Sequence, residues 1–297
     1  MDRRSFMTLI LASLAGAASG ATVGPTTHKA TEPSAQRVKD RAERILDTRQ
    51  IRCGYIPNGP SLRVDPSTKA VSGIFADITH RFGEMVAWNV TWTEESTWST
   101  FPTDLGTDRF DIMVCGIWPN PNRAKVVEFS HPAFYSSVEA YVRPEDHRFD
   151  NDLGRLNDPT ARIVTIDGEL AQSIQASDFP HASVVNLPNT ADLSLMAENV
   201  VTGKADAAFL ERSVAKDYIA KNPGRLRAVP LKRPLRVFED TWACALGASW
   251  LKPILDVAMK DMTSSGYMDR LLAQHHVRDS FLLPRLPFEP AASAGAA

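Results

Sequence analysis

Residues 110–132 read FDIMVCGIWPNPNRAKVVEFSHP, and the order of residue types in this segment gives the first indication of the fold. Its first part, Phe110 to Cys115, is apolar apart from one aspartate and is followed by a glycine. That pattern predicts a buried strand that ends in a turn. Asn120 suits a helix N-cap and Pro121 suits the first helical position, so a short helix is predicted directly after the turn.

The predicted short helix has a cation, Arg123, in its first turn. The positive end of the helix dipole disfavours a cation there. A ligand carboxylate bound at the same place would reverse this preference, because free N–H groups and a guanidinium can share one anion. The alternative is an arginine that pairs with Glu128 or is simply solvated, and local physics favours neither interpretation over the other.

Strands and helices alternate on both sides of this segment. Before it, the hydrophobic pattern predicts strands at 51–55 and 89–92 and helices at 74–85 and 98–105. After it, a second alternating set has strands at 162–166, 183–187, 205–210 and 226–229 and helices at 170–176, 191–201 and 213–221. Such alternation predicts an α/β fold in which each set forms a doubly wound parallel sheet. Two apolar segments, 137–142 and 235–246, are expected to cross between the sets.

Composition limits the class of protein. The chain has 297 residues, enough for two domains, and its 43% hydrophobic and 23% charged residues are typical of a soluble globular protein. The net charge of −2 gives no basic surface for nucleic acid, so no nucleic-acid partner is expected. Cys53, Cys115 and Cys244 have neither Cys-x-x-Cys nor metal-ligand spacing, and buried inert thiols are expected, although a disulfide stays open.

The N-terminus has the features of an export signal. Residues 1–21 contain Arg3-Arg4, a short apolar run and small residues up to Ala21, which predicts a cleaved signal peptide and a periplasmic protein. The paired arginines resemble a twin-arginine signal, but Asp2 departs from that pattern and an ordinary Sec signal remains an alternative. We expect a flexible lead over 22–36 and a disordered tail over 281–297.

Five further segments occur in a characteristic order around the first one. They are IRCGY at 51–55, SGIFADI at 72–78, DRFDI at 108–112, GKADAA at 203–208 and SGYMDRL at 265–271. Together they resemble the periplasmic solute-binding proteins of ABC importers, specifically the polar amino-acid-binding family (bacterial extracellular solute-binding proteins, family 3). The resemblance covers about residues 45–277.

This resemblance implies two α/β lobes joined by two hinge strands, the type II periplasmic-binding fold, with the ligand held between them. The first lobe would comprise residues 37–138 and 243–280, and the second would comprise residues 143–237. The resemblance also implies a small-molecule solute and a membrane ABC permease, on separate chains, as partners of a monomeric receptor. It implies no cofactor, no metal and no catalytic residue.

Carried over residue by residue, the resemblance assigns a ligand carboxylate to Arg123 and a stacking role to Trp98, although Trp98 could instead face the core from a short helix. Trp118 and Asn120 stand where the family usually has Ser and Thr, so either residue contacts the ligand or only shapes the loop. Tyr55, directly after the first strand, either closes over the ligand or packs under the hinge.

Two acidic residues depart from the family pattern and narrow the ligand class. Glu169 replaces a small hydroxyl residue at a helix start, where an acid also suits the helix dipole. Glu211 stands at the family's amine-binding aspartate, or else pairs with Arg212 or a nearby lysine. Two acids opposite one arginine favour a basic amino acid, an opine-like compound or a small amine, and disfavour glutamate.

The function expected from these observations is a periplasmic receptor that passes a small polar, nitrogen-containing solute to an ABC permease. Two alternatives use the same fold. One is a dehydratase-like enzyme in which Glu211 or Glu169 acts as a general acid, although the sequence contains none of the common nucleophile, zinc or phosphate-loop motifs. The other is a module that delivers its ligand to a separate sensor.

Overall fold

The structure, a computed structural model, describes residues 35–59 and 61–284. The predicted signal peptide, 1–21, lies outside the described residues. The predicted lead over 22–36 overlaps the first helix, which begins at Ala35. The Gln36 side chain donates a hydrogen bond of 2.6 Å to Asp40 one turn later, and residues four apart on a helix can stabilise it in this way.

The helices and strands follow one another along the chain as the alternating pattern predicts. The helices are α1 (Ala35–Thr48), α2 (Ile74–Val86), α3 (Phe101–Gly106), α4 (Leu170–Asp178), α5 (Ser194–Val201), α6 (Arg212–Lys221), α7 (Lys252–Ser264) and α8 (Tyr267–Gln274), with 3-10 turns η1 (Arg123–Lys125) and η2 (Leu153–Leu156). The strands are β1 (Gln50–Tyr55), β2 (Arg63–Val64), β3 (Val71–Ser72), β4 (Asn89–Glu95), β5 (Ile112–Ile117), β6 (Val127–Phe129), β7 (Phe134–Val142), β8 (Arg162–Ile166), β9 (Ser183–Leu187), β10 (Ala207–Glu211), β11 (Arg227–Ala228), β12 (Arg236–Ala245) and β13 (Phe281–Leu282).

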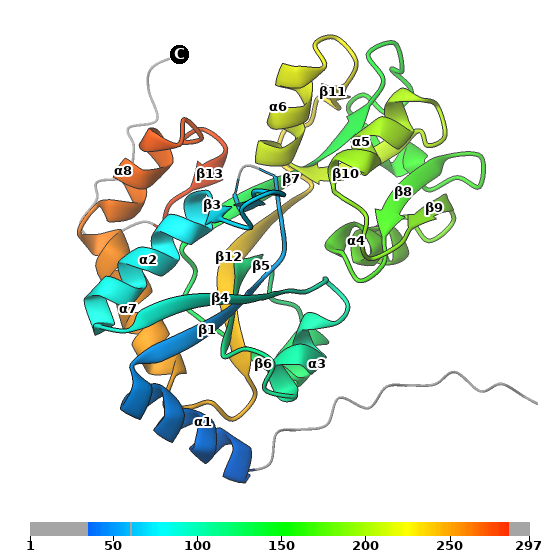
Figure 1. Ribbon diagram of the computed structural model, residues 1–297. Coiled ribbons are helices and arrows are strands. Elements are labelled where there is room, and N and C mark those ends of the chain that lie inside the picture. Colours follow the sequence, from blue (N-terminus) through cyan, green and yellow to red (C-terminus); the bar gives the residue numbers. More distant parts are fainter. Residues whose placement is uncertain (1–34, 60, 285–297) are drawn as a thin grey trace, which may run out of the picture.

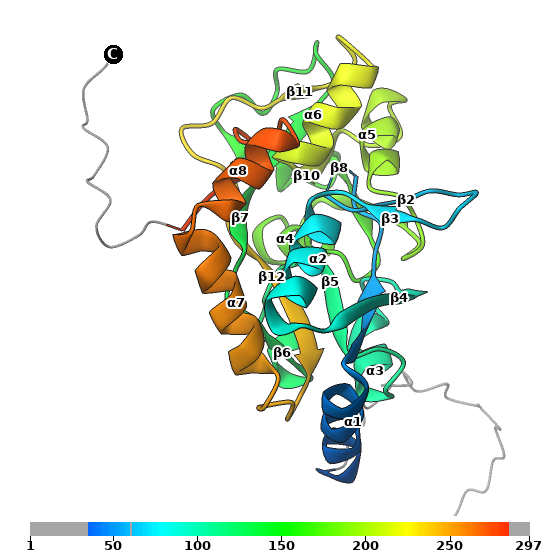
Figure 2. The same ribbon diagram turned by 60° about the vertical axis from the view of Figure 1, so that its left-hand side comes forward.

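Two parallel sets of strands are joined by two long antiparallel strands. In the first set β1 pairs in parallel with β4 and β5, and in the second β8 pairs in parallel with β9 and β10. Strand β12 pairs with β5 at one end and with β7 at the other, both antiparallel. Figures 1 and 2 show β7 and β12 passing from one half of the molecule to the other.

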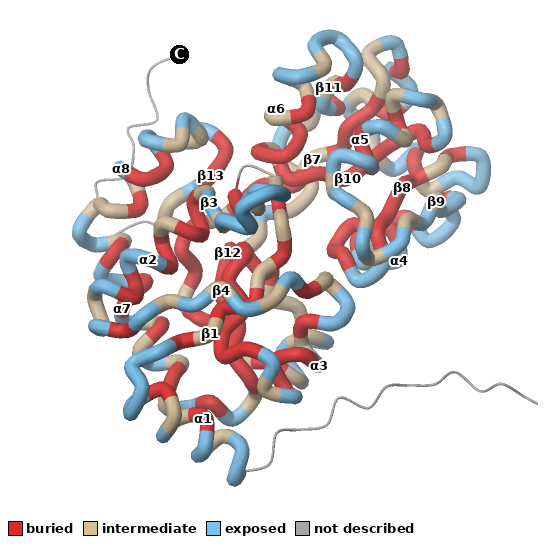
Figure 3. The backbone as a smooth tube through the Cα atoms, viewed as in Figure 1, coloured by how far each residue is buried: buried red, intermediate tan, exposed pale blue. Residues whose placement is uncertain are grey.

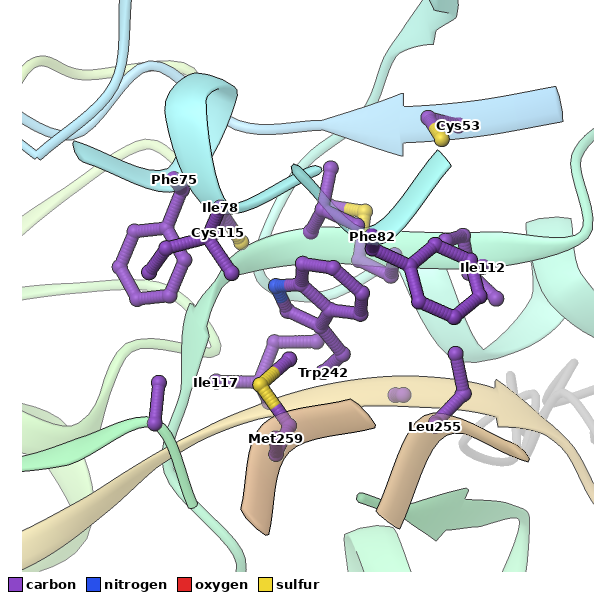
Figure 4. Close-up of a cluster of buried hydrophobic side chains, with 14 of the residues drawn as sticks. Cys53, Phe75, Ile78, Phe82, Ile112, Cys115, Ile117, Trp242, Leu255 and Met259 are labelled. Carbon is purple, nitrogen blue, oxygen red and sulfur yellow. The ribbon is translucent and has the colours of Figure 1, made fainter. Parts of the chain in front are cut away.

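The buried hydrophobic side chains form two separate clusters, which we use to define the lobes. Lobe 1 surrounds the cluster that contains the fully buried Trp242. The centroid of its ring lies 5.6 Å from that of the Phe82 ring (Figure 4). Lobe 2 surrounds the cluster that contains α4, α5, α6 and β8 to β10. In Figure 3 the buried segments of the two lobes lie in two groups, with exposed helix faces outside them.

In both lobes a buried aspartate forms hydrogen bonds with the first strand of the sheet. The backbone N–H of Asp111, just before β5, donates to the carbonyl of Arg52 at 2.8 Å, and the Asp111 side chain accepts the Arg52 N–H at 2.8 Å. Asp206, just before β10, does the same with Arg162, whose N–H lies 2.9 Å from its carboxylate. Each aspartate is buried among arginine side chains. The motifs DRFDI and GKADAA are therefore structural anchors of the two sheets.

The predicted disordered tail over 281–297 is wrong at its start. Phe281 and Leu282 form β13, which pairs with β7, and the Phe281 ring packs on Phe134 at 4.5 Å. Burial of that ring explains why the chain stays ordered to this point. Cys53, Cys115 and Cys244 are buried and unpaired, as expected for inert thiols. Within residues 35–59 and 61–284, no helix has the length and apolar character needed to cross a membrane.

Candidate ligand site between the lobes

A cavity lies between the lobes, next to the carboxyl ends of β5 and β10, the edge at which open α/β sheets bind ligands. It encloses about 410 Å³ between atoms, including its opening to solvent, but the centre of a water molecule can occupy only about 20 Å³ of it. The cavity is therefore narrow in this conformation. Its lining residues are Asn58, Trp98, Gly116, Trp118, Arg123, Glu169, Leu170, Leu193, Phe209, Leu210 and Glu211.

The short helix predicted after β5 is a single 3-10 turn, η1. The Asn120 side chain accepts the Arg123 N–H at 2.9 Å, and its carbonyl accepts the Ala124 N–H at 2.9 Å. Asn120 therefore caps the turn, as its position suggested, but it does not line the cavity. Because these two N–H groups already have partners, neither is free to bind an anion, whereas the Arg123 side chain lines the cavity.

The Arg123 guanidinium bridges the two lobes. It donates hydrogen bonds to the carbonyl of Trp118 at 3.0 Å and to that of Gly168, in lobe 2, at 2.9 Å. The rings of Trp98 and Phe101 lie 5.9 and 5.4 Å from it, within range of cation–π attraction. Burial lowers the pKa of this guanidinium, and the charge of Glu169 opposes the shift.

Neither alternative for Arg123 applies. Glu128 accepts the Gly247 N–H at 2.8 Å instead, and the arginine is half-buried rather than solvated. In the described part of the chain, no carboxylate forms an ion pair with Arg123.

Trp118 belongs by sequence to lobe 1 but packs into the hydrophobic cluster of lobe 2. Its ring stacks on Phe238 of β12 at 4.7 Å. Its indole N–H lies 3.1 Å from both the Ser136 hydroxyl and a carboxylate oxygen of Asp240. Trp118 therefore lines the cavity and also fixes the hinge strands beneath it.

Glu169 is the N-cap of α4 rather than a residue of its first turn. One carboxylate oxygen accepts the Ala171 N–H at 2.6 Å, so the helix-terminal role considered from the sequence is real. The side chain is nevertheless buried and lines the cavity. Burial raises the pKa of Glu169, while the helix N–H groups and Arg123 oppose that shift.

Glu211 ends β10 and precedes α6, and its side chain is buried in the cavity wall. The Ser213 hydroxyl donates a hydrogen bond to it. The alternative pairing with Arg212 is absent, because that arginine pairs with Glu139. Burial raises the pKa of Glu211 to about 7, the nearby Glu169 charge raises it as well, and the Ser213 hydrogen bond opposes the shift.

Of the seven residues predicted for the site, the structure brings together Trp98, Trp118, Arg123, Glu169 and Glu211 in the lining. Tyr55 lies outside it, with its ring edge-on to Trp92 at 5.9 Å. Sequence reasoning missed Asn58, whose side-chain oxygen is buried without a hydrogen-bond partner among the described residues. The Asn58-Gly59 turn is the one signal that pointed to this loop. The apolar lining residues carried no signal that separates them from core.

Comparisons with known proteins agree on the family and fold. Residues 51–277 match the family model described as bacterial extracellular solute-binding proteins, family 3. A search among curated proteins finds no match.

Solved structures of amino-acid-binding proteins superpose on most of the chain. One is an ancestral amino acid-binding protein, described as a precursor of cyclohexadienyl dehydratase, with 20% identity and a TM-score of 0.69 over 79% of this chain and 98% of that one. Another is an amino acid ABC transporter substrate-binding protein of Streptococcus pneumoniae bound to L-arginine, with 16% identity and a TM-score of 0.68 over 80% and 99%. A third is a mutant arginine-binding protein of T. maritima, with 20% identity and a TM-score of 0.67 over 79% and 98%. At these identities the likeness concerns the fold.

Proposed function

The chain belongs to the bacterial extracellular solute-binding proteins, family 3, and from that membership we propose that it is a periplasmic receptor for a small cationic or zwitterionic solute, which it delivers to an ABC permease. The observation that carries this proposal is the charge pattern of the cavity. A guanidinium without a carboxylate partner in the described chain faces two buried carboxyl groups across the space between the lobes.

The proposed ligand contains one carboxylate and at least one amine or guanidinium. Arg123 would bind the carboxylate through a charged hydrogen bond, and Glu211 would bind the amine. Trp98 would cover the aliphatic or planar part of the ligand, and Glu169 would disfavour ligands with a second carboxylate. Solved structures of the same fold with bound L-arginine support a basic amino acid as the first candidate.

A thermal-shift screen of the mature protein tests this function. The panel contains L-arginine, L-lysine, L-ornithine, an opine and a polyamine, with L-glutamate as the anionic comparison. A ligand present at 100 times its Kd should stabilise the protein by about 2.7 kcal/mol. We expect a shift with a basic or zwitterionic compound and none with L-glutamate. A flat screen, or stabilisation by L-glutamate alone, would contradict the proposal.

One observation favours a second function, an enzyme that removes water from a hydroxylated carboxylate. With its pKa raised to about 7, Glu211 is partly protonated at neutral pH, as a general acid must be, and it faces the same cavity as Arg123. The ancestral binding protein with the same fold is described as a precursor of a dehydratase. Glu211 would donate its proton to the departing hydroxyl group, which leaves as water when the C–O bond breaks, while the electrons of the neighbouring C–H bond form the new C=C bond and that proton passes to solvent.

Turnover separates the enzyme from the receptor. The protein is incubated with hydroxylated cyclohexadienyl carboxylates, and loss of water from the substrate is followed by mass spectrometry. An enzyme would show turnover that Glu211→Gln abolishes without abolishing substrate binding. Saturable binding without turnover would support the receptor alone.

A further inference from the structure

Asp240 is a buried carboxyl group beside the cavity that neither the family resemblance nor the lining residues include. It lies in the hinge strand β12, where pairing with β7 gives way to pairing with β5. Its side chain is 2% exposed. One carboxylate oxygen accepts the Trp118 indole N–H at 3.1 Å, and the other is buried without a hydrogen-bond partner in the described chain.

The carboxyl group of Asp240 lies directly behind the cavity wall. A methyl group placed on the cavity-lining Gly116 would lie 2.9 Å from the Asp240 carboxylate, so almost nothing separates that carboxylate from the wall. Trp118, the residue that donates to it, also lines the cavity. A charge on Asp240 would therefore act on a bound ligand through a thin layer of protein.

Three buried carboxyl groups act on one another through their charges, since Glu211 acts on Asp240 and Glu169 acts on Glu211, and we call these three residues the carboxyl cluster. The exposed fractions of Glu169 and Glu211 are 8% and 6%. The other titratable groups whose charges act on this cluster are Arg123 on η1, the Cys115 thiol on β5 and the Tyr141 hydroxyl on β7. If all three carboxyl groups were ionised, Arg123 would compensate only one of them. Unpaired charges in a buried space are strongly unfavourable, so the empty cluster must hold protons.

We propose that Asp240 is a specificity-determining residue of this ligand site, protonated in the empty protein and ionised when a cationic group binds. This inference rests on the proposed receptor function for the location of the ligand. The cation of the ligand replaces the proton, and the proton is released to solvent. The site would therefore favour a ligand with a net positive charge over a neutral isostere.

The electrostatics of the cluster agree with this assignment. Burial raises the pKa of Asp240 well above its ordinary value, the charge of Glu211 raises it further, and hydrogen bonds from Ser136 and Trp118 oppose the shift. Glu211, with a pKa of about 7, is ionised first as the pH rises. The proton that remains in the empty cluster once Glu211 is ionised is assigned to Asp240, because neighbouring carboxyl groups titrate in sequence.

Calorimetric titration at about pH 8, in two buffers with different ionisation enthalpies, counts the released protons. The probes are L-arginine and L-citrulline, in which a neutral urea group replaces the guanidinium. The proteins are wild type, Asp240→Asn and, as a matched control, Glu239→Gln, because Glu239 is the exposed neighbour on the same strand. We expect the wild type and the control to release about one proton with L-arginine and none with L-citrulline. Asp240→Asn should release none and should prefer L-arginine over L-citrulline about tenfold less.

Two calorimetric results would overturn the inference while leaving the receptor function standing. One is binding of L-arginine by the wild type without proton release. The other is equal proton release by wild type and Asp240→Asn. Binding of L-citrulline but not of L-arginine would also overturn it.

Unfolding of the empty protein tests the protonation of Asp240 without any ligand. Asparagine mimics the neutral acid, so only the wild type loses a proton as the pH rises. As the pH rises above the ordinary pKa of an aspartate, the unfolding constant of the wild type should rise relative to that of Asp240→Asn, by at most tenfold per pH unit. A constant ratio would overturn the inference even if no compound in the panel binds, whereas a rising ratio with no ligand would count against the receptor function alone.

Discussion

Arg123 is held in place by two backbone carbonyls, one from each lobe, rather than by a carboxylate. Carbonyl oxygens orient the guanidinium but leave its charge uncompensated. The arginine is also flanked by the rings of Trp98 and Phe101, at distances that allow cation–π attraction. A cation kept in this way stays available to a ligand anion while the protein is empty.

Replacement of this arginine should weaken ligand binding. We expect Arg123→Ala to lower the affinity for a carboxylate ligand by about 1.5–3 kcal/mol, the range of a hydrogen bond to a charged group. Isothermal titration with the ligand found in the screen measures the change. Lys125→Ala, on the same turn but exposed, is the control and should leave Kd unchanged. Equal affinity of wild type and Arg123→Ala would show that the guanidinium does not bind the ligand.

The sequence indicated candidate site residues where a charged residue stands at a position that local structure or the family pattern does not favour. Arg123 stood out because a cation is disfavoured in the first turn of a helix, whereas Glu169 and Glu211 were predicted only as departures from the family pattern. Tyr55 was ambiguous from the start, because the direction of a side chain at a strand end depends on neighbours such as Trp92. Asp240 was missed, because an acid next to the exposed Glu239 gives no sign that one of the pair is buried.

At the level of elements, hydrophobic periodicity located most of the helices and strands, because each buries one face or both. It did not show that the crossing strands β7 and β12 run antiparallel to their neighbours, since pairing direction leaves no mark on periodicity. It also missed the two-residue strands β2, β3 and β13, which are too short to show a period. The helix predicted at residues 98–105 begins later, at Phe101.

The loop before α4 is in contact with lobe 1. Gly168 has a φ of +76°, and a methyl group on it would lie 2.9 Å from the Ser99 backbone N. Asn189 of lobe 2 also donates a hydrogen bond of 2.7 Å to the Ser99 hydroxyl. The approach of the lobes at this point therefore depends on the absence of a side chain at residue 168.

We expect Gly168→Ala to weaken ligand binding by about 1–3 kcal/mol, the cost of an overpacked contact, because the lobes could no longer approach fully. Gly203→Ala is the matched control, because Gly203 has nearly the same φ, +75°, but no atom within 4 Å of the added methyl group. Both variants should lose about 1 kcal/mol of folding stability through the positive φ. Titration calorimetry and urea unfolding measure the two effects. Equal Kd values for the two variants would show that this contact does not govern closure.

In both lobes a buried aspartate binds the first strand of the sheet, and a different set of buried carboxyl groups lies at the cavity where the lobes meet. The anchors, Asp111 and Asp206, are surrounded by arginines and stabilise each sheet from within. The carboxyl groups at the cavity lack such partners. Asp206 and the raised-pKa carboxyl groups at the cavity therefore depend on pH in opposite ways, and folding stability should pass through a maximum.

On the acid side, arginine side chains and the Arg162 N–H lower the pKa of Asp206 to about 2 despite its burial. Because the folded pKa lies below the ordinary value, the contribution of Asp206, about 2 kcal/mol, is present above pH 4 and is lost as the pH falls toward 2. Asp206→Asn should lower folding stability near neutral pH by a similar amount. Below pH 4, the stability of this variant should depend less on pH than that of the wild type.

Above the stability maximum, the relevant group is Glu211, whose pKa is raised to about 7 from an ordinary value of 4.5. The folded protein then binds the proton more tightly than the unfolded chain, so stability falls by about 3 kcal/mol as the pH rises from about 4.5 to 7. Glu211→Gln should remove the share of this loss that Glu211 contributes, about 3 kcal/mol, and leave the share of Asp240, whereas Glu239→Gln should retain both. The free energy of unfolding, measured in urea from pH 2 to 9, should therefore be greatest between about pH 4 and 5. A maximum near pH 7 in the wild type would show that Glu211 is ionised in the empty cavity, with a partner that compensates its charge.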